Sequence, residues 1–339
     1  SILGRNPDDW DITTSAVPSQ IKTFFKRTVD TGIAHGTVTI MIDKTGYEVT
    51  TYRIDGEYED GRHPKSVEFS DRLVDDLCRR DFTINAMAYN DTDGFVDEFK
   101  GLDDLDTKII RCVGEPELRF TEDALRMMRA IRFSAQLGFT IDEATWNAIK
   151  KLSPSISKIS MERVHVELGK TLMSAHPDYV AQYSEAGLFA PILPVIDNAL
   201  KSRYKRKILA TLQHTPDNIY LRYAALFITS TPDEAAKTLR ALKLDNKTVN
   251  TVSKLVELSK MDIEETEPAV RTALNKYGRD FLPLWHELMM AVIQASEDIT
   301  GISNPAKVKH LLTLKRLGTD ILARGDCFTI KDLDISGND

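Results

Sequence analysis

The pattern of apolar and polar positions separates a first part of the chain, with mixed signals, from a longer part with helical signals. In the first part, several segments alternate or carry β-branched residues in runs, as strands do. We predict strands in segments 9–13, 36–42 and 47–52, and helices in segments 18–26 and 74–90. Turn-forming residues at 43–46 separate the last two strands, which predicts a hairpin.

From residue 117 to residue 315 strand signals nearly vanish and apolar residues recur with the period of a helix. The clearest helical segments are 122–137, 142–152, 161–173, 232–242 and 246–258. We therefore predict an α+β head followed by an all-α remainder. Segment 55–70 is acidic, contains Gly and Arg, and is the longest stretch predicted to lack regular structure. A loop of that length within a compact domain is usually functional.

Composition narrows the class of protein. The chain has 339 residues, of which 42% are hydrophobic and 28% are charged, which fits a globular protein of two or three domains. It contains neither an apolar run long enough for a membrane span nor a secretory leader, so we expect a cytoplasmic protein with no membrane partner. Cys78, Cys112 and Cys327 form neither a zinc pattern nor a disulfide framework. The net charge of −7 disfavours nucleic-acid binding by the whole surface, but it leaves a local basic face possible.

Two aspartates in the first predicted strand are candidates for metal ligands. Side chains alternate between the faces of a strand, so Asp9 and Asp11 share one face, while Trp10 and Ile12 turn the other way and are expected in a core. Two neighbouring carboxylates repel each other unless a cation lies between them, and Mg²⁺ prefers such oxygen ligands. For an isolated Asp-x-Asp pair, a solvated acidic turn is the more common explanation.

A third carboxylate strengthens the metal hypothesis. Glu48 lies between Tyr47 and Val49 in a predicted strand and therefore faces away from them. If that strand lies beside segment 9–13, Glu48 completes a site of three carboxylates that suits phosphoryl transfer with two metal ions. On its own, Glu48 is more simply explained as a surface residue. We predict Asp9, Asp11 and Glu48 as catalytic, with Asp9 and Asp11 as ligands of Mg²⁺.

These residues carry a resemblance to a known family. Gly-Arg-Asn-Pro-Asp-Asp-Trp-Asp-Ile-Thr, from residue 4, resembles the first motif of class II tRNA nucleotidyltransferases, whose head belongs to the DNA polymerase β-like nucleotidyltransferases. Segments 31–38 and 47–53 match the next family segments, and Arg-Arg-Asp-Phe-Thr-Ile-Asn-Ala-Met-Ala, from residue 79, matches the motif after them. The likeness extends to about residue 175 and is a general helical similarity beyond it.

The resemblance implies a division of the chain into four parts. These are a nucleotidyltransferase head with a small mixed sheet (1–110), then an elongated all-α neck (111–172), body (173–260) and tail (261–339). Relatives carry a strand and a Gly-Gly-x-Val-Arg-Asp turn before the first motif, and this sequence does not contain them. We interpret the chain as starting late and its tail as truncated. Where relatives have Asp-Pro-Phe-Gly-Gly, segment 96–101 differs, and we expect an altered turn without an effect on the chemistry.

The predicted helix 122–137 is the candidate for reading the nucleotide. Thr121 is expected to cap it, and Leu125, Met128 and Ile131 form an apolar stripe. Asp123 and Arg126 lie one turn apart on another face. A solvated ion pair would explain them without any function. However, an Asp acceptor and an Arg fork on a rigid helix can also imitate the hydrogen-bonding edge of a base.

In the family this helix replaces a nucleic-acid template. The resemblance therefore implies base selection by Asp123 and Arg126. It also implies nucleotide contacts by Arg80, Arg129 and Arg132. We leave His35 out of the catalytic set, because a His beside Gly-Thr at the start of a strand is more often structural. Arg163 and Glu167 match a family segment that braces the fold, and we expect an ion pair within one helix.

Two basic runs in the helical part are candidates for RNA contact. The side chains that we predict to bind RNA are Lys201, Arg203, Lys205, Arg206, Lys307 and Lys309. Such runs are usually solvated faces, but the resemblance implies that this part holds a tRNA acceptor stem through its shape and phosphate charge. Some relatives carry a His-Asp phosphohydrolase motif here. Segment 224–231 has no His-Asp pair, so we expect no second hydrolytic site.

The resemblance implies an enzyme that adds CCA to the tRNA 3′ end from CTP and ATP, with Mg²⁺ and without an obligate protein partner. Two alternatives stay within the class: a poly(A) polymerase, and an enzyme that adds only part of CCA. Partial enzymes of the family have a shortened loop after the third carboxylate, whereas segment 55–70 has full length, which favours complete addition. A third alternative, of a different class, is an inactive RNA-binding fragment.

Overall fold

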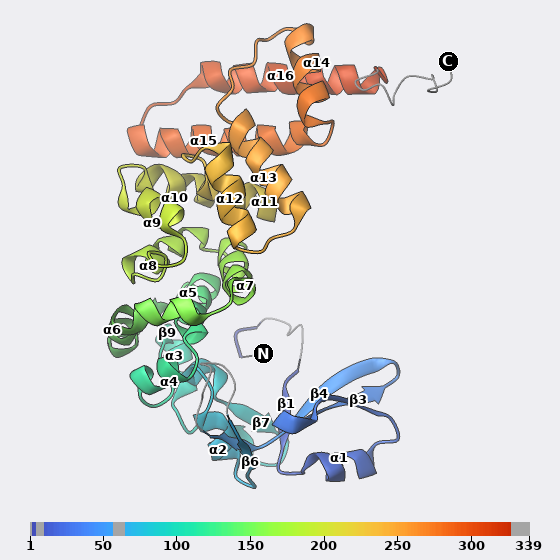
Figure 1. The fold of residues 1–339 in the computed structure, drawn as a ribbon, viewed down its shortest axis with the longest axis vertical. Coiled ribbons are helices and arrows are strands. Elements are labelled where there is room, and N and C mark those ends of the chain that lie inside the picture. Colours follow the sequence, from blue (N-terminus) through green and yellow to red (C-terminus); the bar gives the residue numbers. More distant parts are fainter. Residues whose placement is uncertain (1, 5–9, 57–64, 327–339) are drawn as a thin grey trace. The chain divides into compact units, whose positions relative to one another are not determined.

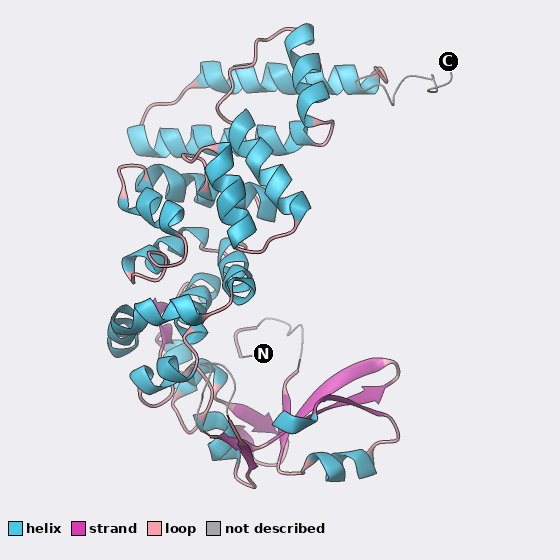
Figure 2. Cartoon of the chain, viewed as in Figure 1, coloured by secondary structure: helices cyan, strands magenta, loops and turns pink. Residues whose placement is uncertain are grey.

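The computed structural model describes residues 2–4, 10–56 and 65–326 of the chain. These residues form two compact units, and each is described here by itself. The first unit comprises residues 1–130 and 140–152, and the second comprises 131–139 and 153–339. In the parts of the chain that are described, strands occur only in the first unit (Figure 2).

The first unit begins with a four-stranded sheet in the order β1-β4-β3-β2. Its strands are β1 (Ile12–Thr14), β2 (Thr28–Gly32), β3 (Thr37–Ile42) and β4 (Thr45–Thr51). β1 pairs with β4 in parallel, while the other two pairings are antiparallel. Helix α1 (Pro18–Phe24) supplies Ile21 to a small core with Val38, Ile40 and Val49 on one face of the sheet. The mixed sheet predicted for the head is confirmed, although β2 was not among the predicted strands.

The predicted hairpin is the connection of β3 to β4. Asp43 and Lys44 form its turn, with φ angles of 46° and 71°. Two successive residues with positive φ are the signature of a type I′ turn, whose twist matches that of the flanking strands. The register puts Val38 opposite Val49, so these two buried side chains share one face.

The structure corrects two predictions in the next part of the chain. The predicted helix 74–90 ends at Cys78, with Arg79 as its C-cap, and the chain continues into the short helix η2 (Thr83–Asn85) and two short strands. Segment 55–70 was predicted to lack regular structure, but its two ends pair as antiparallel strands. Residues 57–64 of that segment lie outside the described residues. The elements here are β5 (Arg53–Asp55), β6 (Val67–Phe69), α2 (Leu73–Cys78), η2 (Thr83–Asn85), β7 (Ala88–Asn90) and β8 (Gly94–Val96).

Helices complete the first unit. They are α3 (Gly101–Asp106), α4 (Pro116–Glu122), the first half of α5 (Leu125–Leu137) and α6 (Glu143–Leu152), and the short strands β9 (Ile109–Ile110) and β10 (Thr140–Ile141) pair in parallel. In the altered turn at 96–101, Lys100 has a φ of 60° and the Asp97 carboxylate accepts from the backbone N–H groups of Gly101 and Leu102. This carboxylate therefore caps α3.

The second unit is built from helices in its described part (Figure 1). Its α-helices are α7 (Met161–Leu172), α8 (Val180–Glu185), α9 (Pro194–Lys201), α10 (Lys205–His214), α11 (Ile219–Leu226), α12 (Pro232–Ala241), α13 (Asn246–Leu258), α14 (Glu267–Tyr277), α15 (Phe281–Thr300) and α16 (Pro305–Ala323). The predicted helices 161–173, 232–242 and 246–258 are confirmed to within a residue. Among the helices described, none is long and apolar enough to cross a membrane.

Candidate functional site

The sheet brings two of the predicted catalytic carboxylates to one face. Ile12 pairs with Val49 in parallel register, so Asp11 and Glu48 each stand one residue before this pair. The buried Val49 belongs to the core face, and alternation puts Glu48 on the opposite face together with Thr50. Asp11 and Glu48 are both exposed. The three-carboxylate site was predicted on the condition that the strand of Glu48 lies beside the first strand. The structure meets this condition, because β4 pairs with β1.

The first strand also departs from expectation. Trp10 is 64% exposed and Ile12 is 41% exposed, so the prediction that they turn into a core is wrong for this structure. The reason is that β1 stands at the edge of the sheet and α1 covers the central strands instead. Asp9 lies outside the described residues. No group of three His, Cys, Asp or Glu side chains poised for a metal occurs among the residues that are described.

The segment that we predicted to select the nucleotide is built differently from the prediction. α4 ends at Glu122 and α5 begins at Leu125, so the single helix 122–137 is wrong at its start. Asp123 lies in the break with φ −145°, and its carboxylate accepts from the Leu125 N–H at 3.0 Å. Thus Asp123, not Thr121, caps α5, while the Thr121 hydroxyl bonds back to Glu117 within α4. The predicted apolar stripe is confirmed, because Leu125, Met128 and Ile131 are buried.

Arg126 is held at both terminal nitrogens. Its Nη1 donates to Glu122 Oε2 at 2.7 Å, and its Nη2 donates to the carbonyl of Arg79 at 3.1 Å. Arg119 joins the second oxygen of Glu122 and donates to the Cys78 carbonyl. Burial raises the pKa of the Glu122 carboxyl, while Arg119 and Arg126 act in the opposite direction. Arg126 therefore has a fixed orientation before any nucleotide is bound.

The other three predicted arginines have different surroundings. Arg80 donates to the Asn85 carbonyl and lies 3.4 Å from the buried Asp76. Arg129 donates to Asp81 at 2.6 Å, and its side chain is 35% exposed. Arg132 lies in the second unit, where it is buried and paired with Glu167 of α7. Its part in nucleotide contact stays a prediction.

Around Arg126 the structure shows a larger group that the sequence did not indicate. We call it the arginine cluster: Arg53, Arg79, Arg80, Arg119 and Arg126 with Asp55, Asp76 and Glu122. Guanidinium groups outnumber carboxylates in it, so the cluster carries a positive surplus. Its members are separated along the chain and join only through folding, although the excess of arginine at 79–80 was a visible signal. A positive surplus with bidentate donors suits an anionic phosphate ligand.

Two further residues have contacts or burial that the structure defines. The backbone carbonyl of His35, in the short helix η1 (Ile33–His35), accepts from Arg53. This contact does not involve the imidazole, so leaving His35 out of the catalytic set stays a prediction. Cys112 is buried, and burial raises the pKa of its thiol to about 12, so it is not a nucleophile near neutral pH.

The two basic runs lie in the second unit and differ in how far their charges are paired. Lys201 bonds to Asp197 at 2.9 Å, and Lys205 bonds to Glu185 at 2.7 Å. Arg203 stacks on Tyr204, with its guanidinium carbon 5.0 Å from the ring centre. Lys307 and Lys309, on α16, are exposed and form no ion pair with any described residue. The second run therefore offers the more available charge to a phosphate.

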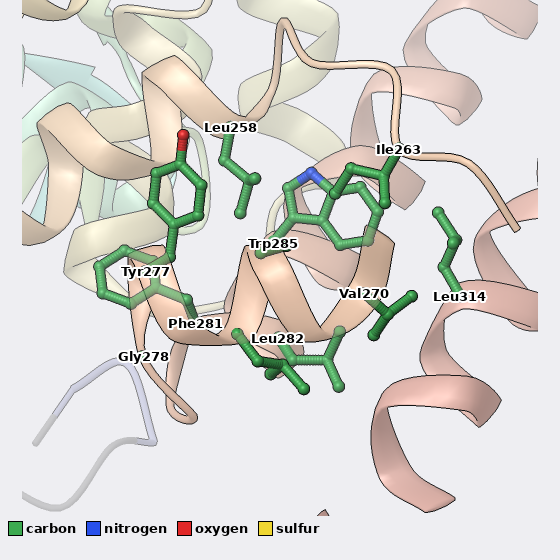
Figure 3. Close-up of a pocket in the computed structure, with 11 residues that line it drawn as sticks. Leu258, Ile263, Val270, Tyr277, Gly278, Phe281, Leu282, Trp285 and Leu314 are labelled. Carbon is green, nitrogen blue, oxygen red and sulfur yellow. The ribbon is translucent and has the colours of Figure 1, made fainter. Parts of the chain in front are cut away.

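A pocket of about 340 Å³, which includes space open to solvent, lies in the second unit (Figure 3). Its lining residues are apolar and aromatic: Leu258, Ile263, Val270, Ala273, Leu274, Tyr277, Gly278, Phe281, Leu282, Trp285 and Leu314. A triphosphate needs cationic donors, and this lining supplies none. The pocket is therefore separate from the nucleotide site that the arginine cluster indicates.

Comparison with known proteins gives concordant results. Residues 1–111 match the family model described as the poly A polymerase head domain, and residues 138–200 match the probable RNA and SrmB-binding site of polymerase A. A CCA-adding enzyme of Streptococcus suis is 38% identical over 323 residues, which are 93% of this chain and 76% of that protein. The CCA-adding enzyme of Bacillus stearothermophilus in complex with CTP matches with a TM-score of 0.73 and 32% identity. That match covers 99% of this chain and 79% of the other.

Identity is higher over a shorter stretch. A CCA-adding enzyme of Ligilactobacillus salivarius is 52% identical over 177 residues, which are 52% of this chain. The match spans 44% of that relative's length. The likeness is therefore strongest over about half of the chain, whereas the Streptococcus suis match extends through both units.

Proposed function

Because the chain belongs to the family of CCA-adding enzymes, we propose that it adds cytidine and adenosine nucleotides to the 3′ end of tRNA from CTP and ATP, with release of pyrophosphate. The observation that carries the proposal is the 38% identity over 93% of the chain to an enzyme of that name. The tRNA substrate makes the cytoplasm the expected location of this activity.

The carboxylates of the sheet fit a divalent metal ion. Asp11 and Glu48 present exposed oxygen donors on one face of neighbouring strands, and oxygen is the ligand that Mg²⁺ prefers. We propose Asp9, Asp11 and Glu48 as the catalytic carboxylates, with Asp9 and Asp11 as the metal ligands. When bound, Mg²⁺ would lower the pKa of the attacking tRNA hydroxyl and neutralise the charge on the leaving pyrophosphate.

The chain's own side chains bind and orient the nucleotide. In the reaction the terminal tRNA hydroxyl forms a bond to the α-phosphorus, and the bond from that phosphorus to pyrophosphate breaks. We propose that Arg80 and Arg129 contact the nucleotide, because both side chains are partly exposed, at 25% and 35%, and Arg80 belongs to the positively charged cluster. Asp123 and Arg126 would read the base, the first as acceptor and the second as donor. Arg132, further along α5, would also contact the nucleotide.

We propose that the helical part holds the tRNA. The candidate contacts are Lys201, Arg203, Lys205, Arg206, Lys307 and Lys309, all in the second unit. The division into head (1–110), neck (111–172), body (173–260) and tail (261–339) belongs to the same proposal. In support, the match to an RNA-binding segment covers residues 138–200, within the proposed neck and body.

The decisive experiment is incubation of the protein with tRNA lacking its CCA end, with CTP and ATP supplied separately and together. CTP alone should extend the tRNA by two nucleotides, and both together should extend it by three, since CCA has that composition. Chelation of divalent metal should stop both reactions. Extension by many residues with ATP alone would indicate a poly(A) polymerase, a stop after CC would indicate a partial enzyme, and binding without extension would indicate an inactive module.

A further inference from the structure

Arg79 follows α2 and joins two buried carboxylates from different elements. Its Nε and Nη2 donate to Asp76 Oδ1 at 3.0 and 2.7 Å, and its Nη1 lies 3.8 Å from Asp55 Oδ2. Asp76 is fully buried, and the Asp55 side chain is 6% exposed. Arg79 thereby links α2 to the end of β5, and two charged partners in low-dielectric surroundings fix its position.

The backbone of the same residue holds Arg126. The Arg79 carbonyl accepts from Arg126 Nη2 at 3.1 Å, while Glu122 accepts from Nη1 at 2.7 Å. Nη1 also donates to the Arg119 carbonyl at 3.5 Å, so Nη1 has two acceptors, whereas Nη2 is anchored by the Arg79 carbonyl. The plane and direction of this guanidinium group depend on where the Arg79 carbonyl lies.

We propose that Arg79 is a positioning residue that sets the orientation of Arg126, and that Asp55 determines nucleotide specificity by fixing Arg79. The inference rests on the proposed function, in which Arg126 reads the base. Neither Arg79 nor Asp55 needs to touch the nucleotide. Asp55 also pairs with Arg53, at 3.0 Å, so loss of its charge releases both arginines. Arg79 then keeps Asp76 alone, its carbonyl gains freedom, and Arg126 loses a fixed anchor.

The loss of this anchor of Arg126 should change the discrimination between nucleotides more than any other property. A donor fork reads a base by direction, and small displacements of a reading group reduce the preference for the correct partner. The binding of tRNA by the second unit does not depend on these contacts. We therefore expect a change in nucleotide choice that is larger than the change in stability or in the KM for tRNA.

The test compares Asp55→Asn and Arg79→Lys with the parent protein. Asn keeps the shape of Asp55 without its charge, and Lys keeps the charge of Arg79 but cannot reach both carboxylates with a fixed fork. The kcat/KM for CTP relative to UTP, and for ATP relative to GTP, should fall about tenfold in both variants, within the usual range of coupling between neighbouring residues. Glu117→Gln is the matched control, since it removes an exposed carboxylate from α4 in the same unit, and it should retain the parent's discrimination.

Several outcomes would overturn the inference while leaving the proposed function intact. One is full discrimination in folded Asp55→Asn and Arg79→Lys proteins. Another is an equal loss of rate with all four nucleotides, because this would show a structural role only. If Arg79→Lys fails to fold, Asp55→Asn decides alone. If the parent protein adds no nucleotide to tRNA, it is the proposed function that fails, and the two failures are thereby distinguished.

Discussion

At the scale of single residues, Asp11 has the clearest chemical task. It is exposed on the same face as Glu48, where no described side chain provides a compensating cation. Replacing it with Ala should leave the fold and tRNA affinity nearly unchanged, because the side chain supports no packing. The rate of nucleotide addition should fall by several orders of magnitude, about 4 kcal/mol or more in barrier.

Single-turnover assays at saturating Mg²⁺, with tRNA binding measured in parallel, would check this expectation. The same result is expected for Asp9→Ala. Near-normal addition by either variant would mean that these carboxylates do not hold the metal.

Asp123 has two tasks that mutation can separate. Its carboxylate caps α5, and it is the proposed acceptor for the base. Asp123→Ala should cost about 1 kcal/mol of stability and also raise UTP and GTP incorporation, whereas Asp123→Asn, which also caps helices well, should change only the nucleotide choice. Arg126→Ala should likewise blur the choice.

Thermal unfolding together with competition between nucleotides would measure both effects. If the Asn and Ala variants at 123 and Arg126→Ala all keep the parent's discrimination, Asp123 and Arg126 are no more than structural partners.

Whether the role of a residue could be predicted from the sequence depended on how far apart along the chain its partners lie. Asp11 and Glu48 followed from alternation along strands, which is a local property. Asp76 and Arg119 could not be found in this way, because their role comes from ion pairs between segments that meet only in the folded chain. Burial of charge is invisible in the sequence until the partner is known.

At the scale of elements, the β3–β4 turn contains an avoidable strain. Lys44 has a φ of 71°, a region in which a side chain with a Cβ is disfavoured and Gly is not. Lys44→Gly should therefore raise the free energy of unfolding of the first unit by about 0.5–1 kcal/mol.

Denaturant unfolding, followed by far-ultraviolet circular dichroism, would measure this gain in the free energy of unfolding. Lys26→Gly is the control, because Lys26 is equally exposed but lies outside the residues with positive φ, and it should bring no gain. A loss of stability for Lys44→Gly would show that the Lys side chain contributes more than the strain costs.

The paired strands β5 and β6 allow a clean deletion in segment 55–70. Gly56 and Ser66 are joined by a backbone hydrogen bond of 2.9 Å, so their ends stay close when residues 57–64 are removed. The chemistry proposed for Asp9 and Asp11 would be common to all three additions, whereas the proposed site must change to accept the larger purine. We expect the shortened protein to add CC and then stall.

Extension assays resolved on sequencing gels would reveal the stall. Equal loss of C and A addition by a folded deletion variant would contradict a specific part for this segment in adding the final A.

Helices could be predicted where the helical period of apolar residues extends over many residues, as in 161–173 and 246–258. The predictions failed where the helix is interrupted. Asp123 divided one predicted helix, because its carboxylate bonds to the Leu125 N–H and competes with helix continuation. The other, 74–90, ended at Cys78 and gave way to short elements. The short strands β7 to β10 were not predictable because two or three residues carry no period.

At the scale of the molecule, α16 carries the more available charge of the two basic runs. Lys307 and Lys309 are exposed there without an ion pair to described residues, so each should contribute to phosphate binding. Replacing either with Gln should weaken tRNA binding and lower the slope of log affinity against log salt by about one.

Binding titrations over a range of salt concentrations would give this slope. Lys237→Gln, which removes an exposed charge from α12 outside the basic runs, should leave the slope unchanged. Equal slopes for all three variants would place the RNA elsewhere on the second unit.

Helix α5 has a consequence for any attempt to exchange the two units between relatives. The boundary passes within this helix after Ala130, and the chain crosses it again at 139–140 and at 152–153. A fragment ending at residue 130 would lack Asp142 and Thr145, which bond to Arg111 and to the Cys112 backbone. Recombination at one crossover point would therefore yield an incomplete head, and chimaeras would need matched segments on both sides of residues 131–139.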